Sequence, residues 1–418
     1  MGPPGPAPGN RSGRWRGSLS TMRKNLARKL LDACIGHVLI GCLLVYDLLR
    51  RIVVRVHRTP LERLEVQSIL VIKLCCLGDG VLALPAIRAL KQRYPAARLT
   101  MICTPRNTEA FRGQEFIDEC VELPLTGLEG LGELFRSSLG AFRKAVAAGR
   151  ACRPQVAVDL DLYYKVTPIL AFLSGAAVRV GFDTAGKNRA GLFTHRAPRA
   201  ADKHELECFL DVLGALGITT DDRSTCLWQD PEAVGTVREK LLGAGIDPGT
   251  GYAVVAPGSS RNWPEKRWAP DRFAALGTWL AERHGLPVVL IGAGFEAELA
   301  EAIAADIQGR AVSFAGTSSI RETIEILRSA AIVVSNDSGP MHLAAAVGAP
   351  VVGIFGPTNP VKWRPWGERA RVVTAVDACP KMPCYYLSSM PECDAADCIG
   401  RISVEQVSNA VDELLGTD

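Results

Sequence analysis

The chain has little net charge for its length, because its 48 Lys and Arg side chains are nearly matched by 44 Asp and Glu. Residues 1–60 alone hold nine Arg and two Lys against two Asp, so the excess of +4 lies at the N-terminus and the remainder is slightly acidic. A chain without a basic surface beyond its first residues gives no reason to expect nucleic acid as a partner. At 418 residues and 48% hydrophobic content, it can form two or three globular domains.

The N-terminal region lacks an apolar run long enough to cross a bilayer, which takes about 20 residues. Its uncharged stretch, Ala33–Tyr46, is closed by Asp32 and Asp47 and flanked by Arg and Lys on both sides. No small-residue cleavage site of a signal peptide follows it. We therefore predict a membrane-associating helix at residues 22–60 that lies on an anionic membrane surface through residues 22–58. A spanning helix, a signal peptide and a helix packed on its own protein are the alternatives.

Beyond residue 60 the chain lacks a residue-level repeat, but one pattern of elements occurs twice. Apolar, β-branched runs end near glycine and lead into helical patterns such as residues 81–95 and 132–148, as expected for strands buried on both faces of a parallel sheet. This order predicts an α/β fold of two Rossmann-like, doubly wound domains. The expected strands are residues 68–74, 97–103, 155–162 and 177–182, then 252–260, 287–294, 331–337 and 350–356.

Turn-rich stretches between residues 214 and 251 indicate where the two domains meet. We predict an N-terminal domain at residues 61–235 and a C-terminal domain at residues 236–418, preceded by a disordered tail at residues 1–21 that is rich in Pro, Gly and Arg. Two facing sheets enclose a cleft at the carboxyl ends of their strands, which is where open α/β folds bind ligands.

The loop after the first strand of the second domain has the features of an anion site. Pro257 and Gly258 are followed by the hydroxyls of Ser259 and Ser260, and Lys266 comes soon after them. Small residues let backbone N–H groups approach an anion closely, and a cation adds charge. The pattern predicts a diphosphate site, with a solvated basic turn as the alternative.

Glu296 follows the next strand of that domain, in the first turn of a helix. Its carboxylate is placed to accept hydrogen bonds from ribose hydroxyls. A carboxylate is also favourable at a helix N-terminus without any ligand, so a purely local charge is the alternative.

A polar segment at residues 336–342, NDSGPMH, stands between two apolar runs. Asp337, Ser338 and Gly339 end a strand, and the proline after them fits the first turn of a helix. The N–H groups and the positive end of the helix dipole are therefore predicted to point into the cleft as a second anion site. His342 lies beside Asp337 in this turn, which favours a ligand contact over a core position.

Four segments in order resemble known motifs: ILVIKLCCLGDGVLALPAIRALKQRYPAARL, APGSSRNWPEKRWAPDRFAAL, GAGFEAELAEAI and SNDSGPMHLAAAVGAPVVGIFGPTNP. Over residues 68–415 they resemble glycosyltransferase family nine, the lipopolysaccharide heptosyltransferases and their relatives. The resemblance implies a GT-B fold, with an acceptor domain followed by a nucleotide-sugar domain. It also implies an inverting transferase, which in its best-known members moves heptose from ADP-heptose, and an acceptor of the lipopolysaccharide-core or a related lipid-linked type.

The resemblance also assigns residues. Asp79, in a Gly-rich turn after the first strand, would be the general base that deprotonates the acceptor hydroxyl, with a helix cap as the alternative. Lys73 and the pair Cys75-Cys76 depart from the family's usual Arg and hydroxyl residues, which affects the acceptor contacts. The other site residues would hold, in turn, the donor phosphates, the ribose, and the pyrophosphate and sugar: Ser259, Ser260 and Lys266; Glu296; and Asp337, Ser338, Gly339 and His342.

The resemblance implies no required cofactor and leaves open a divalent cation such as Mg²⁺ on the donor diphosphate. The closing helix at residues 403–415 is expected near or across the domain interface. A transferase with a lipid-linked acceptor is expected in the cytoplasm, peripheral on the inner face of the inner membrane. The alternatives are a family-nine transferase using another nucleotide sugar, a non-hydrolysing nucleotide-sugar epimerase, and a catalytically silent saccharide-binding or scaffold protein.

Four of the thirteen cysteines are grouped in a Cys-rich segment, residues 379–398: Cys379, Cys384, Cys393 and Cys398. Their spacing is at the edge of what a tetrahedral zinc site uses. Two disulfides and the packing of reduced thiols are the alternatives, and a reducing cytoplasm disfavours the disulfides. The other nine are scattered among apolar segments and are predicted to be small core residues.

Overall fold

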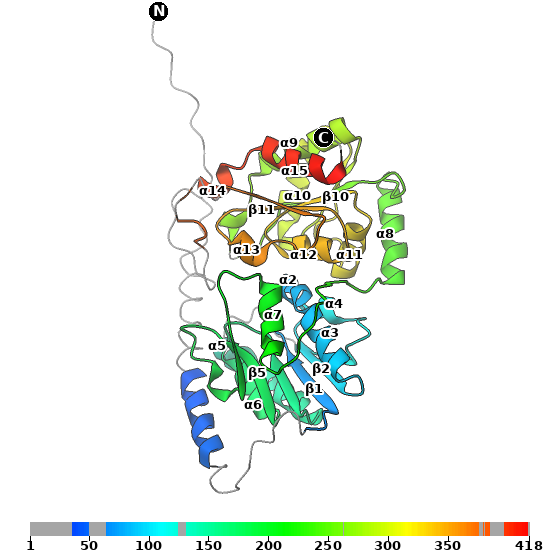
Figure 1. Cartoon of the computed structure of the whole chain (residues 1–418). Helices are drawn as coiled ribbons and strands as arrows, with labels where there is room; N and C mark the ends of the chain where they lie inside the picture. Colours follow the sequence, from blue (N-terminus) through cyan, green and yellow to red (C-terminus); the bar gives the residue numbers. More distant parts are fainter. Residues whose placement is uncertain are drawn as a thin grey trace, which may run out of the picture.

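A computed structural model describes residues 36–49, 64–123, 131–261, 263–375, 379, 381–384 and 397–416. Within this part the chain forms two α/β domains that face each other (Figure 1). The predicted tail at residues 1–21 and the basic flanks of the N-terminal helix lie outside the described residues.

The first domain is built on a sheet of parallel strands in the order β3-β2-β1-β4-β5-β6. Ser68 of β1 pairs with Arg98 of β2, and Ile69 pairs with Val156 of β4, so β1 is central and all of its residues are buried. The strands are β1 (Ser68–Ile72), β2 (Arg98–Cys103), β3 (Glu119–Glu122), β4 (Val156–Asp159), β5 (Val178–Asp183) and β6 (His195–Pro198). The helices are α2 (Leu77–Leu82), α3 (Leu84–Arg93), α4 (Thr108–Phe111), α5 (Leu131–Ala151), α6 (Val166–Leu173), η2 (Ala190–Leu192) and α7 (Glu205–Gly214).

The second domain repeats this plan, with strands in the order β12-β11-β10-β7-β8-β9. The strands are β7 (Ala253–Ala256), β8 (Val288–Leu290), β9 (Ala311–Ser313), β10 (Ile332–Asn336), β11 (Val351–Phe355) and β12 (Ala370–Thr374). The helices are α8 (Pro231–Gly243), η3 (Pro264–Lys266), α9 (Pro270–His284), η4 (Gly294–Glu296), α10 (Ala297–Asp306), α11 (Ile320–Arg328), α12 (Gly339–Ala346), α13 (Pro360–Trp363), α14 (Asp397–Gly400) and α15 (Val404–Leu415).

The two sheets share one topology, because β7 to β12 occupy the places that β1 to β6 occupy in the first sheet. In each sheet the winding direction reverses between two adjacent central strands, β1 and β4 or β7 and β10, and ligands of such sheets bind at the carboxyl ends of those strands. Figure 1 shows these ends of the two sheets turned toward each other, with α2 opposite α12. The predicted architecture of two Rossmann-like domains is confirmed.

The helical pattern at residues 81–95 forms two elements instead of one. α2 ends at Leu82 and α3 begins at Leu84, with Ala83 between them. Pro85 lies in the first turn of α3, where its missing N–H needs no partner, but its ring disfavours a helix that runs on through the preceding residues. The break makes α2 a short, separate element at the cleft.

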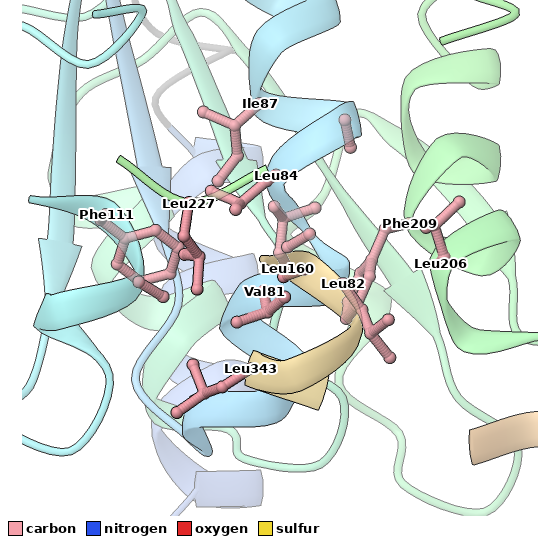
Figure 2. Close-up of a cluster of buried hydrophobic side chains, with 14 of the residues drawn as sticks. Val81, Leu82, Leu84, Ile87, Phe111, Leu160, Leu206, Phe209, Leu227 and Leu343 are labelled. Atoms are coloured by element: carbon pink, nitrogen blue, oxygen red, sulfur yellow. The ribbon is translucent and has the colours of Figure 1, made fainter. Parts of the chain in front are cut away.

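The apolar core continues across the domain interface. Val81 of α2 and Leu343 of α12, from opposite domains, belong to one buried cluster (Figure 2). Gly78 and His342 approach so closely that a Cβ atom at residue 78 would lie 2.6 Å from the imidazole Cδ2. Because burying apolar surface contributes about 25 cal/mol per Å², this contact stabilises the closed arrangement of the two domains.

Helix α8, which follows the link between the domains, and the closing helix α15 both belong to the second domain. The predicted boundary after residue 235 falls inside α8, which packs on α11, and Lys240 of α8 lies 3.4 Å from Glu322 of α11.

The expectation that the closing helix lies near the domain interface is wrong. α15 packs on α9 and β12, with His284 Nε2 3.0 Å from Asp412 Oδ1, and Figure 1 shows it on the side away from the cleft.

A helix at residues 36–49 lies against the first domain (Figure 1). Ile40 is buried in the cluster that lines β1 and α6, and Leu44 packs over Gly191 of η2. The alternative of a helix packed on its own protein therefore holds for one face. On the other face five apolar side chains are each more than half exposed: Val38, Val45, Tyr46, Leu48 and Leu49. Within the described residues, no helix has the length and apolar character to cross a membrane.

Candidate active site at the domain interface

Asp79 lies where β1 leads into α2, at the switch point of the first sheet. It is inside the first turn of α2, whose N-cap is Cys76, and that cap makes no side-chain hydrogen bond. Oδ2 of Asp79 lies 3.4 Å from Nζ of Lys73, the residue after β1. The carboxylate therefore pairs with a cation, and the helix-cap alternative is wrong.

The environment of Asp79 suits a group that accepts a proton. Its side chain keeps 15% exposure. Burial raises the pKa of this carboxyl to about 6, and the charge of Lys73 opposes the rise. Asp79 is therefore ionised at neutral pH, with a pKa close enough to the working pH to act as a general base.

The second domain has a cavity of about 170 Å³ at its own switch point, next to the ends of β7 and β10. The cavity brings together loops that follow three different strands. Lys266 of η3, Asp337 after β10 and His342 of α12 do not line the cavity. The other five predicted donor residues line the cavity: Ser259, Ser260, Glu296, Ser338 and Gly339.

The two serines of the first loop have different roles. Ser259 is buried, and its hydroxyl donates to the carbonyl oxygen of Trp263 at 2.9 Å and accepts from Nε of Arg267 at 3.1 Å. Ser260 is exposed at the cavity. Ser259 therefore holds the loop in shape, and Ser260 is the serine whose hydroxyl is placed to contact a ligand.

Glu296 is held tightly in the cavity wall. Its Oε2 accepts from the N–H of Ala293 at 2.8 Å, and desolvation raises the pKa of the carboxyl. Gly258 packs so closely on it that a Cβ atom at residue 258 would lie 2.0 Å from Oε1. Glu296 therefore has a fixed orientation in the cavity wall, and its bond to the N–H of Ala293 agrees with the local alternative at the start of η4. Its contact with a ribose hydroxyl stays a prediction.

Lys266 and Asp337, both predicted to contact the donor, are paired with each other. Nζ of Lys266 lies 2.7 Å from Oδ2 of Asp337, and both side chains are largely buried. An anion that binds here meets a cation already oriented by a carboxylate. A phosphate that contacts Lys266 must therefore displace the Asp337 carboxylate or share the ammonium group with it.

The start of α12 faces the cavity with its backbone. Ser338 is the N-cap in extended conformation and makes no side-chain cap bond, and Gly339 is the first helical residue. Both line the cavity, so the first N–H groups and the helix dipole are available to an anion. The geometry permits the predicted anion site, which stays a prediction.

His342 lies at the contact of α12 with α2. It is 5% exposed, and desolvation lowers the pKa of its imidazole to about 4, so the ring is neutral at pH 7. Its Nδ1 has no hydrogen-bond partner within the described chain. The ring is both packed against Gly78 and left with one unused polar atom, so it combines the features of a core histidine and a ligand contact.

Sequence reasoning did not single out Asn336 or Phe295. Asn336 is fully buried and ties the two anion loops together, because Oδ1 accepts from the N–H of Trp268 at 3.0 Å and Nδ2 donates to the carbonyl oxygen of Pro257 at 2.7 Å. Phe295 lines the cavity and is 46% exposed, with the Arg261 guanidinium 4.6 Å from its ring centroid. The available signals were an Asn that ends an apolar strand and an aromatic residue next to Glu296.

The cysteines near the cleft are thiols. Sγ of Cys75 and Sγ of Cys76 lie 2.7 Å apart, and the hydrogen bond between them raises the pKa of Cys76. The Cys76 thiol is therefore neutral at pH 7 and stands just before Asp79 in the chain.

One residue of the Cys-rich segment, Cys384, contacts the second domain. The N–H of Cys384 donates to the carbonyl oxygen of Pro357 at 3.0 Å, in the loop after β11. Cys379, Cys384 and Cys398 form no disulfide in the described part of the chain, and Cys393 lies outside it. No group of three metal-ligating side chains assembles among the described residues. The zinc site therefore stays a prediction.

Comparison with known proteins places this arrangement in a family. The model of glycosyltransferase family 9 (heptosyltransferase) matches residues 155–391. Lipopolysaccharide heptosyltransferase 3 of Escherichia coli is 28% identical over 301 residues, which cover 70% of this chain and 84% of that protein.

Two solved structures have the same fold. The glycosyl transferase family 9 structure from Veillonella parvula matches with a TM-score of 0.71 at 21% identity and covers 84% of this chain and 98% of its own. The Escherichia coli heptosyltransferase WaaC with ADP matches with a TM-score of 0.62 at 19% identity and covers 83% and 99%. The family match extends over more than half of the chain and includes every strand from β4 to β12. The chain belongs to glycosyltransferase family 9, the heptosyltransferases, and is a glycosyltransferase.

Proposed function

We propose that the protein is an inverting transferase that moves heptose from ADP-heptose onto a lipopolysaccharide-core or related lipid-linked saccharide. The observation that carries this proposal is the contact of α2 with α12, which sets Asp79 across the cleft from a cavity built of anion-binding loops. The donor is supported by relatives whose structures are described with ADP and with ADP-2-deoxy-2-fluoro heptose. The acceptor class is supported by a relative named for lipopolysaccharide.

In the proposed reaction, Asp79 accepts the proton of an acceptor hydroxyl while that oxygen attacks the anomeric carbon of the donor. The bond from this carbon to the diphosphate breaks on the opposite side, so the configuration inverts and ADP leaves as an anion. The N–H groups at the start of α12, with Lys266, would stabilise the leaving charge. One such preorganised donor is typically worth about 3 kcal/mol. No protein nucleophile is needed, and a Mg²⁺ ion on the diphosphate is an addition to be tested.

We extend the proposal to the membrane. The exposed apolar face of the helix at residues 36–49 is followed in the sequence by Arg50, Arg51, Arg55 and Arg58. Near an anionic lipid surface each such cation contributes about 1 kcal/mol. The helix lies on the acceptor domain, so binding to the inner face of the inner membrane from the cytoplasm would bring a lipid-linked acceptor to the domain that holds Asp79.

The test is a transfer assay with the full chain. A panel of ADP-, GDP- and UDP-sugars that includes ADP-heptose is offered with lipid A–core extract, and released nucleoside diphosphate and the glycolipid product are measured. We expect transfer from ADP-heptose alone. Asp79→Asn should still bind ADP in calorimetry but lose about 10²- to 10⁴-fold in kcat, the usual contribution of a general base.

Each other outcome contradicts a different part of the proposal. Transfer from another donor contradicts the heptose assignment, and full activity of Asp79→Asn contradicts the base. Isomerisation of a nucleotide sugar without acceptor indicates an epimerase, and nucleotide binding without turnover in any condition indicates a silent binding protein. Loss of activity with EDTA that Mg²⁺ restores shows that the cation takes part.

A further inference from the structure

Lys73 is a buried cation held between two carboxylates. Its Nζ lies 3.4 Å from Oδ2 of Asp79 and 3.4 Å from Oδ1 of Asp161. The side chains of Lys73 and Asp161 are 0% and 1% exposed, whereas Asp79 keeps 15%. An unpaired charge in such a place is costly, so the ammonium group constrains both carboxylates. Of the three side chains, Asp79 is the one that solvent in the cleft reaches.

The position of Lys73 is fixed from the core side. Oδ2 of Asp161 accepts from the N–H of Leu74 at 2.6 Å, and the N–H of Asp161 donates to Oδ1 of Asp159 at 2.9 Å. Asp159 in turn forms a fully buried ion pair with Arg189. Because β1 and β4 are hydrogen-bonded neighbours, these groups form an anchored network of buried charges, in which Asp161 lies next to Asp159 and Lys73 links Asp161 to Asp79.

We propose that Lys73, anchored by Asp161, is the positioning residue of the general base, which orients the Asp79 carboxylate toward the acceptor and balances its charge. The inference rests on the proposed function, because it needs Asp79 as the base. Lys73 holds Oδ2, which leaves Oδ1 of Asp79 for the acceptor proton. Lys73 itself is inaccessible from the cleft and touches no substrate.

Several charged or titratable groups face Asp79 from the elements around it. They are Lys73 after β1, Asp161 after β4, Glu205 on α7 and the Cys76 thiol. On α12, His342 contacts Gly78, the residue before Asp79. Burial and the charges of Glu205 and Asp161 raise the pKa of Asp79, and Lys73 lowers it. The Cys76 thiol and the His342 ring are neutral at pH 7. Removing the Lys73 charge should therefore raise the pKa of the base, and removing the Asp161 charge should lower it.

The test compares pH profiles of kcat/KM. Lys73→Met keeps the length of the side chain and removes its charge, so we expect the acid limb to move up by one pH unit or more, with activity partly recovered at high pH. Asp161→Asn keeps an oxygen that accepts from the N–H of Leu74, but removes the carboxylate that shares Lys73 with Asp79. The pKa of Asp79 should therefore fall, and the acid limb of this variant should move to lower pH. Opposite shifts are not expected from general damage to the fold, and calorimetric ADP binding confirms that the second domain is intact.

Each result decides the matter. If Asp79→Asn is inactive but neither variant moves the limb, Lys73 is a structural core charge and the inference fails while the proposed function stands. If Asp79→Asn is active, the base itself is wrong. If Lys73→Met does not fold, Asp161→Asn decides alone: a downward shift supports the proposal, and an unmoved limb overturns it.

Discussion

Lys362 and Glu205 form a buried ion pair between the two domains. Nζ of Lys362, on α13, lies 2.9 Å from Oε2 of Glu205, the first residue of α7, and the side chains are 4% and 0% exposed. Arg199 lies 3.0 Å from the same oxygen. Helix α13, which carries Lys362, follows β11 and the Gly-Pro-Thr segment of the second domain. The pair therefore connects the donor side of the cleft to the acceptor domain.

Breaking this pair should loosen the closed cleft. Glu205→Gln leaves the ammonium of Lys362 and the guanidinium of Arg199 buried without a counter-charge, and such a loss typically costs about 3–5 kcal/mol. The double variant Glu205→Gln/Lys362→Met should lose less free energy of unfolding than the sum of the losses in the two single variants, because it removes the cation that Glu205→Gln leaves unpaired. Urea unfolding gives the losses, and small-angle scattering should show a larger radius of gyration for the single variants.

The second interdomain ion pair supplies the control. Arg321 of α11 contacts Glu109 of α4, and their side chains keep 14% and 15% exposure. Glu109→Gln should have a smaller effect, because solvent screens partly exposed charges. Equal unfolding midpoints for wild type and Glu205→Gln would show that the buried pair adds nothing to closure.

The strands that sequence patterns predicted are the central ones of each sheet. β1, β2, β4 and β5, and their counterparts β7, β8, β10 and β11, are buried between helices and need continuous apolar runs, which the sequence displays. The four strands at the sheet edges were not predicted: β3, β6, β9 and β12. An edge strand has one neighbour and less cover, so sequences as polar as ECVE and HRAP suffice there.

The candidate site was predictable where its residues follow a strand in sequence. Asp79, Ser260 and Gly339 could be located because a short polar or Gly-rich loop after an apolar run is a local signal. The pair Glu205–Lys362 could not, because its members lie 157 positions apart and neither stands in a motif. The inward turn of the Ser259 hydroxyl also depends on tertiary contacts, since its partners become neighbours only after the loop folds.

Activity should depend on the ionisation of Asp79. A base must be deprotonated, and the pKa of this carboxyl is about 6, so kcat/KM should fall about tenfold per pH unit below that value and level off above it. The pKa of His342 is about 4, so this ring is neutral throughout the range and adds no limb above pH 5. Profiles from pH 5 to 8.5 test this, and His342→Gln should keep the same midpoint. A profile that stays flat down to pH 5, or a midpoint that moves in His342→Gln, contradicts the assignment.

Gly258→Ala should damage the donor cavity. The new Cβ atom would lie 2.0 Å from Oε1 of Glu296, so the carboxylate must leave its position in the cavity wall. We expect at least a tenfold loss of ADP affinity, equivalent to about 1.4 kcal/mol, measured by calorimetry. Gly235→Ala in α8 is the matched control, because no heavy atom lies within 4 Å of its Cβ position. It should leave ADP binding unchanged and stabilise the helix by about 0.5–1 kcal/mol. Wild-type affinity in Gly258→Ala would place the nucleotide elsewhere.

The N-terminal helix should bind anionic vesicles through its exposed face. Leu48 is 58% exposed, and inserting such a side chain into lipid contributes about 1.5–3 kcal/mol when complete, so Leu48→Asp should weaken partitioning by about tenfold or more. Ile40, on the packed face, is a poor site for this test because its loss would first destabilise the first domain. Leu242→Asp on α8 is the control, since Leu242 is 48% exposed but lies on the other domain.

Flotation with vesicles of anionic and of neutral lipid measures both terms of this binding. The Arg-rich flank predicts weaker binding to neutral lipid and a loss of binding with rising salt. The apolar face predicts that a fraction of the vesicle binding remains at high salt. If Leu48→Asp and Leu242→Asp weaken binding equally, the helix has no special role at the membrane. If only Leu48→Asp reduces both vesicle binding and transfer to lipid-embedded acceptor, while ADP binding is unchanged, the helix serves to place the acceptor domain at the lipid surface.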